Sequence, residues 1–67
     1  MKRKYYYTVH TKYGKFSSIN IEWTDEECDL ARKSFAEAVE MTIYTDKGFI
    51  CLPKAIIQDS VFEIVRL

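Results

Sequence analysis

Apolar and polar side chains alternate at the start of the chain in a pattern that predicts two strands. Residues 4–10 alternate with a period of two and are rich in aromatic and β-branched types, which is typical of a strand with one buried face. Residues 15–23 alternate in the same way, and the turn between the segments contains Gly14, which tolerates positive φ. An antiparallel hairpin is therefore predicted. The side chains expected to face the core are Tyr5, Tyr7, Val9, Ile19, Ile21 and Trp23, and those expected to face outward include Tyr6, Thr8 and His10.

A helix is predicted to begin after Thr24. The Thr24 hydroxyl can accept a hydrogen bond from the backbone N–H of Glu27, and the Glu27 carboxylate can reach back to the N–H of Thr24, which is the pattern of a capping box. Apolar residues then recur at helical spacing and define one stripe that faces the core. Leu30 lies off this stripe and is a candidate exposed contact. The stripe consists of Cys28, Ala31, Phe35, Ala38 and Val39.

A second hairpin is predicted after the helix. Residues 41–45 alternate and run into Asp46-Lys47-Gly48, which is a strong turn signal. The apolar residues 49–52 then form the returning strand. Pro53 has no N–H to donate to a neighbouring strand, so we expect the strand to end there.

The last segments predict a turn and a closing strand. Residues 54–60 are expected to form a turn or one short helical turn. Residues 61–67 are apolar on both faces except at Glu63 and Arg66. Such a pattern is typical of a strand that is covered on both sides or central in its sheet.

Together these elements predict an α+β domain of two layers. The order is strand, strand, helix, strand, strand, strand, with the helix packed on a mixed or antiparallel sheet. Element order and lengths resemble the β-grasp, or ubiquitin-like, layout over nearly the whole chain. The sequence ends in Arg66-Leu67 rather than a diglycine, so no conjugation chemistry carries over. An antiparallel meander and a small half-open barrel plugged by the helix are the alternative arrangements.

The composition is that of one small domain. The chain has 67 residues, of which 48% are hydrophobic, with one Trp, five Tyr and four Phe. A core of this size typically supplies about 3–5 kcal/mol, so it depends on large side chains. No apolar run approaches the roughly 18 residues of a membrane span, and the basic start at residues 1–4 is followed by tyrosines rather than by the apolar run of a secretory signal. We therefore expect a single domain over residues 1–67 that acts in the cytoplasm.

Charge is distributed unevenly along the chain although it sums to zero. Residues 1–16 carry five basic side chains and no acidic one, whereas residues 17–40 carry seven acidic and two basic ones. Basic and aromatic side chains of the first hairpin suggest binding of single-stranded nucleic acid, in which lysines neutralise phosphates and tyrosines stack on bases. The simpler interpretation is a solvated edge that discourages aggregation, and zero overall charge favours it. The residues of the nucleic-acid hypothesis are Lys2, Arg3, Lys4, Tyr6, Lys12, Tyr13 and Lys15.

The sequence favours a protein that is not an enzyme. The spacings of phosphate-binding loops, dinucleotide sites, serine hydrolases and zinc proteases do not occur. A nucleophile at Cys28 with His10 as its base is conceivable, but the helical stripe directs Cys28 into the core. One histidine and two distant cysteines fall short of a zinc set. We therefore expect no catalytic residue, cofactor, metal, small-molecule substrate or membrane partner, and we expect Cys28 and Cys51 to be reduced.

An uncovered aromatic sheet face is the main candidate for binding. Alternation places Phe16, Tyr44 and either Phe49 or Cys51 on the side opposite the residues that face the helix. With one helix to cover the sheet, this second face is left partly bare, which is typical of a protein contact or homodimer surface. The alternative is that the last strand or the turn at residues 53–60 covers it. The candidate partner-binding residues are Tyr6, His10, Tyr13, Phe16, Leu30 and Tyr44.

The second hairpin also carries a resemblance. The segment Thr45–Lys54, followed by an isoleucine-rich closing strand, is similar to a hairpin common in small uncharacterised proteins of Gram-positive phages and integrated elements. The helix start at Trp23–Glu27 has the same character. This resemblance implies a phage or mobile-element accessory protein that binds and modulates a partner macromolecule, and it implies no shared activity.

Overall fold

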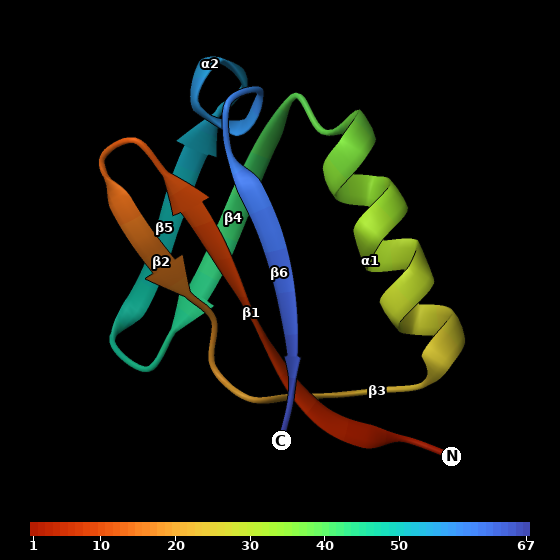
Figure 1. Ribbon diagram of the computed structural model, residues 1–67. Coiled ribbons are helices and arrows are strands. Elements are labelled where there is room, and N and C mark those ends of the chain that lie inside the picture. The colour runs from red at the N-terminus through yellow and green to blue at the C-terminus, as the bar shows by residue number, and fades with distance from the viewer.

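The computed structural model describes residues 1–67 as six strands and two helices (Figure 1). Three strands precede the long helix, and a hairpin, a short helix and a last strand follow it. The elements are β1 (Arg3–Thr11), β2 (Gly14–Ser17), β3 (Ile21–Trp23), α1 (Asp25–Glu37), β4 (Glu40–Thr45), β5 (Gly48–Pro53), α2 (Lys54–Ile57) and β6 (Val61–Arg66).

The main sheet is built around β1, which is its longest strand. β2 and β3 pair with opposite ends of β1 along one edge, and β6 pairs with β1 along the other. All three pairings are antiparallel. One face of β1 is directed into the core through Tyr5, Tyr7 and Val9, as predicted from their alternation.

The strand predicted over residues 15–23 is interrupted by a bulge. Between the paired positions Thr8↔Ser17 and Tyr5↔Ile21, β1 has two residues and the opposite strand has three. One extra residue reverses which face the following side chains occupy. Ser18 fills the gap, because its N–H donates to the Tyr7 carbonyl (2.8 Å) and its hydroxyl accepts from the Tyr7 N–H (3.0 Å).

The bulge overturns two predicted orientations. Phe16 pairs with Val9 and is half-buried against the core, whereas it was expected on the opposite face. Ile19 was expected to face the core but is 45% exposed. Phe16 is separated from Ile21 by an odd number of positions, so strict alternation would place them on opposite faces. Because the bulge lies between them, Phe16, Ile21 and Trp23 all contribute to the inner face.

The β4–β5 hairpin forms a second sheet, which lies across the inner face of the first (Figure 1). The Tyr7 hydroxyl donates to the carbonyl of Thr42 (3.4 Å), and the N–H of Ile19 in the bulge donates to the carbonyl of Tyr44 (3.0 Å). Apolar side chains fill the space between the two sheets. The buried core cluster is Tyr7, Val9, Ile43, Leu52 and Ile57.

Both hairpins turn through the same four-residue pattern, Thr-x-x-Gly. Thr11 and Thr45 each accept a hydrogen bond from the backbone N–H two residues later, at 3.0 and 3.3 Å. The closing residues Gly14 and Gly48 have φ of 125° and 153°, a region that other residues rarely adopt. These local signals explain why the sequence predicted both turns correctly.

α1 begins as predicted, with both hydrogen bonds of the capping box between Thr24 and Glu27 present. Its stripe faces the aromatic side chains of the main sheet, and Phe35 stacks on Phe62 with ring centroids 4.8 Å apart. The helix ends at Glu37, so Val39 leaves the stripe and is 67% exposed, contrary to prediction. None of its residues is fully buried, so the helix covers the core without being enclosed by it.

The α+β two-layer prediction is confirmed, and the sheets are antiparallel with no closed barrel. The short helical turn after Pro53 is present as α2. The last strand differs from the prediction of a central or doubly covered strand, because β6 pairs with β1 alone and Val61 is 64% exposed. The central position belongs to β1, and the helix and the second hairpin cover the same face of the main sheet, so the other face of β6 stays open.

Candidate functional site

The open face of the main sheet carries two of the predicted binding residues. Tyr6 and His10 lie on it, as their alternation with the buried residues of β1 requires. Tyr6 is half-buried opposite Val65, and His10 Nε2 lies 2.9 Å from a carboxylate oxygen of Glu63. Between them, Thr8 is buried and its hydroxyl is 2.8 Å from that of Ser17. Polar pairs therefore already occupy much of this face.

The other predicted residues are dispersed over the molecule. Tyr13 is at the tip of the first hairpin and Leu30 is on α1, where each is more than 60% exposed. Phe16 packs against the core instead of facing a partner. Tyr44 lies on the second hairpin. The six residues therefore belong to several surfaces and do not form one site.

The outer face of the second hairpin presents the most prominent aromatic pair. Tyr44 and Phe49 are direct cross-strand partners with ring centroids 6.3 Å apart, and they are 61% and 65% exposed. Ile19 is held beside Tyr44 by the backbone hydrogen bond from the bulge. Cys51, also exposed, occupies the next outward position of β5. We call Ile19, Tyr44, Phe49 and Cys51 the hairpin strip.

Sequence reasoning identified only part of the hairpin strip. Alternation placed Tyr44 on an outer face and left Phe49 and Cys51 as alternatives, whereas the structure places both outward. Ile19 was missed because its exposure follows from the bulge. The signal that could have located it is Ser18. Its hydroxyl can accept the hydrogen bond of a backbone N–H on the neighbouring strand in place of a backbone carbonyl, which allows one extra residue in the strand at this point.

The basic residues of the first hairpin are divided between two ends of the sheet. At one end, Lys2 Nζ is 3.8 Å from Glu27 Oε1, and Lys4 is the cross-strand partner of Glu22. At the other end, Lys12 Nζ lies 5.4 Å from the centroid of the Tyr13 ring. Eight residues of extended chain, about 26 Å, separate Lys4 from Lys12. A single continuous basic patch is therefore not formed.

The cysteine and histidine weighed for catalysis lie on different faces. Cys28 is beside the Tyr5 phenol on the inner face, where burial raises the pKa of Tyr5 and the contact with the thiol acts in the same direction. His10 is on the open face with Glu63. Cys28 and Cys51 are both free thiols, and no group of three or more metal-binding side chains exists.

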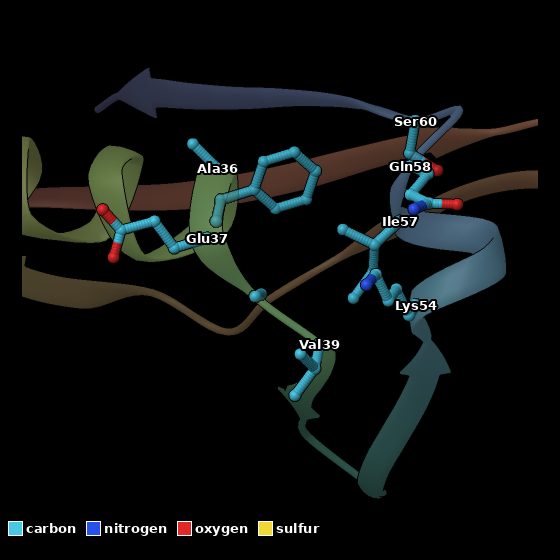
Figure 2. Close-up of a pocket in the computed structure, with 9 residues that line it drawn as sticks. Ala36, Glu37, Val39, Lys54, Ile57, Gln58 and Ser60 are labelled. Carbon is cyan, nitrogen blue, oxygen red and sulfur yellow. The ribbon is translucent and has the colours of Figure 1, made fainter.

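The largest hollow, about 420 Å³, lies between the end of α1 and α2. Its charged and polar side chains do not converge, because the carboxylate of Glu37 is turned away from Lys54 and Gln58 (Figure 2). The hydroxyl of Ser60 is used within the fold, since it donates to the carbonyl of Ile56 (2.6 Å). Convergent polar groups are what small-molecule sites require, so the hairpin strip remains the better candidate.

Comparison with known proteins gave no match to a protein-family model, to a curated protein or to a solved structure. Neither α1 nor α2 has the length and apolar character needed to cross a bilayer. The exposed surfaces of the chain are therefore what indicates its function.

Proposed function

We propose that the protein is a non-enzymatic binding module that holds a partner protein through the hairpin strip. The observation that supports this is the exposed, adjacent pair Tyr44 and Phe49 on the outer face of β4–β5. The resemblance of this hairpin to phage and mobile-element proteins leads us to propose an accessory role in such an element, in the cytoplasm of the host.

The fold itself does not need aromatic side chains at these positions. The inner face of the hairpin supplies the core through Ile43 and Leu52, and the outward pair adds only a cross-strand contact. Such a pair contributes roughly 0.2–1 kcal/mol to a sheet. A partner that covered both rings would remove a much larger apolar area from water, since each buries about 150–250 Å² when enclosed.

The pair is also held in a fixed position, which lowers the entropy cost of binding. Tyr44 is anchored at its carbonyl by the N–H of Ile19, and the carbonyl of Thr42, two residues earlier, accepts from the Tyr7 hydroxyl. Both bonds attach β4 to the main sheet. The backbone that carries Tyr44 is therefore part of a strand that is attached to the main sheet, not of a loop.

The experiment that tests this function compares two variants in partner capture from the host. The double variant Tyr44→Ser/Phe49→Ser removes both aromatic rings of the strip, and Leu30→Ser removes an equally exposed but isolated apolar side chain on α1. We expect a specific partner to be retained by the wild type and by Leu30→Ser, and to be lost from the double variant. Equal capture by all three proteins would remove the strip from the binding site.

Single-stranded nucleic acid is the second candidate, and the tip of the first hairpin favours it. Tyr13 is 69% exposed, with Lys12 over its ring and Lys15 on the adjoining strand. Titration with short oligonucleotides at two salt concentrations distinguishes the candidates, because neutralised phosphates give a steep salt dependence. Absence of binding at low salt would reject it.

A further inference from the structure

The β5 edge of the second hairpin is free, and the hydrogen-bond pattern shows which of its backbone groups point outward. The carbonyls of Thr42 and Tyr44 on β4 bond to groups outside the hairpin, so these residues are in the non-hydrogen-bonded pairs of the β4–β5 ladder. Their partners on β5 are Cys51 and Phe49, which therefore turn both N–H and C=O away from β4. No other strand pairs with β5.

This edge lacks the features that usually protect an edge strand. β5 runs Gly-Phe-Ile-Cys-Leu-Pro without a charged side chain, and its proline stands at the last position. Natural proteins normally place lysine, a proline or a bulge within such an edge to prevent pairing with another chain. Phe49 and Cys51 are both exposed, so the edge is accessible along its centre.

We propose that a second copy of this chain pairs with β5 across this edge, antiparallel, with Phe49 of each copy opposite Cys51 of the other. A two-fold axis then passes between the two Ile50 residues, and the paired hairpins form one four-stranded sheet. Each Phe49–Cys51 pair exchanges two backbone hydrogen bonds, so all outward groups of both residues are satisfied.

The neighbouring symmetric registers fit less well. Setting Cys51 opposite itself would place Phe49 opposite Pro53, which has no N–H, so the Phe49 carbonyl would lack a donor. Setting Phe49 opposite itself would place Cys51 opposite Lys47 in the turn, whose N–H already donates to the Thr45 hydroxyl. The Phe49–Cys51 register avoids both defects.

Charge at the two ends of the hairpin supports the same register. Residue numbers that face each other within β5 sum to 100, and extending this register just past the strand ends brings Asp46 in the turn of one copy near Lys54 at the start of α2 in the other. Within one copy, β5 separates these side chains by about 20 Å, and neither is in an ion pair. Dimerisation therefore creates two symmetric pairs of opposite charge.

The dimer goes beyond the proposed function, because it uses the backbone edge of the hairpin rather than its outer face. Pairing of the two β5 edges leaves Tyr44 and Phe49 uncovered. It also places the two hairpin strips side by side on one surface of the four-stranded sheet. A single strand from each copy buries less than the roughly 800 Å² per partner of a standard interface, so we expect weak, reversible association.

The test is sedimentation equilibrium of the full chain, under reducing conditions, over concentrations that bracket a weak interface. We compare Cys51→Pro, which removes the free N–H and blocks the edge without breaking a backbone hydrogen bond to β4, with Cys51→Ser, which removes the thiol and its contact with the Thr42 hydroxyl but keeps the N–H. The expected result is a reversible dimer for the wild type and Cys51→Ser, and a monomer for Cys51→Pro with an unchanged circular dichroism spectrum. A wild type that stays monomeric throughout overturns the proposal.

Exchanging the charges of Asp46 and Lys54 tests the register without introducing a proline into β5. Asp46→Lys and Lys54→Asp should each weaken the dimer by about 2- to 30-fold, and the double variant should regain wild-type affinity. If Cys51→Pro does not fold, recovery of dimer affinity in the double charge variant decides whether the register is correct. Failure of the double variant to recover affinity overturns the register. A dimer that is lost in Tyr44→Ser/Phe49→Ser but kept in Cys51→Pro is a face contact and also overturns the proposal. Partner capture by the monomeric variant is measured separately, so the proposed function is judged independently.

Discussion

The ring of Phe35 on α1 lies over the ring of Phe62 on β6, with 4.8 Å between centroids and 18° between planes. Tyr7 extends the contact, since its ring is 5.4 Å from Phe62 and 6.0 Å from Trp23. The helix buries none of its residues completely, so this aromatic row is the main attachment of α1 to the sheet. Its attachment is therefore sensitive to single truncations.

The Phe35–Phe62 pair gives the first prediction. Each half-buried ring replaced by alanine should lower the free energy of unfolding by about 2 kcal/mol, below the 3–5 kcal/mol of a fully buried ring. The double variant should show a coupling of about 0.5–1.5 kcal/mol. Urea denaturation of the wild type, Phe35→Ala, Phe62→Ala and the double variant measures this coupling. Leu30→Ala is the control for loss of an exposed side chain. Strictly additive losses would mean that the stacking adds nothing beyond burial.

The second prediction concerns Ser18, which fills the bulge opposite Tyr7. Ser18→Ala removes the acceptor of the Tyr7 N–H, and an unpaired backbone donor in this part-buried position should cost about 1–3 kcal/mol of stability. Ser34→Ala on the exposed surface of α1 serves as a control and should leave stability nearly unchanged. Amide hydrogen exchange at Tyr7 should accelerate in Ser18→Ala alone. Wild-type protection of this amide would indicate that another acceptor replaces the hydroxyl.

Signals within a few residues of each other allowed much of the fold to be predicted. Both Thr-x-x-Gly turns and the Thr24–Glu27 capping box depend on hydrogen bonds between residues two or three apart. These interactions form in the same way whatever the rest of the chain does. The start of the helix and the turns of both hairpins therefore agreed with the structure, whereas the end of the helix and the continuity of the strand over residues 15–23 did not.

Features that depend on distant pairing were predicted less well. Phe16 was assigned to the wrong face because a continuous strand was assumed, and one extra residue at the bulge reverses every orientation across it. The edge position of β6 follows from a choice of partners more than fifty residues apart, such as Val61 with His10. The same limitation applied to the candidate site. Alternation predicted that Tyr44 faces outward and left Phe49 and Cys51 as alternatives beside it, but it did not predict the exposure of Ile19.

The two turn glycines give the third prediction. Gly14 and Gly48 have φ of 125° and 153°, and a Cβ atom at either position would meet nothing within 4 Å. Replacement by alanine should therefore cost only backbone strain, about 1–2 kcal/mol at each site. Lys47→Ala, in the same turn but with ordinary φ, should change stability by less than about 0.5 kcal/mol. Thermal unfolding compares them, and an unaffected Gly48→Ala would show that the turn relaxes into another form.

The capping box makes stability depend on acid pH through Glu27, which gives the fourth prediction. The hydrogen bond from the Thr24 backbone N–H lowers the pKa of the Glu27 carboxyl, and the nearby Lys2 ammonium also lowers it, while partial burial acts in the opposite direction. A folded-state pKa below the unfolded one stabilises the protein above the unfolded value, and this stabilisation is lost as the pH falls through the folded value.

Glu27→Gln keeps an acceptor for the Thr24 N–H but carries no charge. Its stability should consequently decline less than that of the wild type as the pH is lowered below the ordinary value of 4.5. Glu26→Gln, exposed in the same turn and without an ion pair, should follow the wild-type curve. Urea midpoints measured from neutral pH into the acid range test this. Parallel curves for Glu27→Gln and the wild type would show that the capping carboxylate is not the group whose protonation weakens the fold in acid.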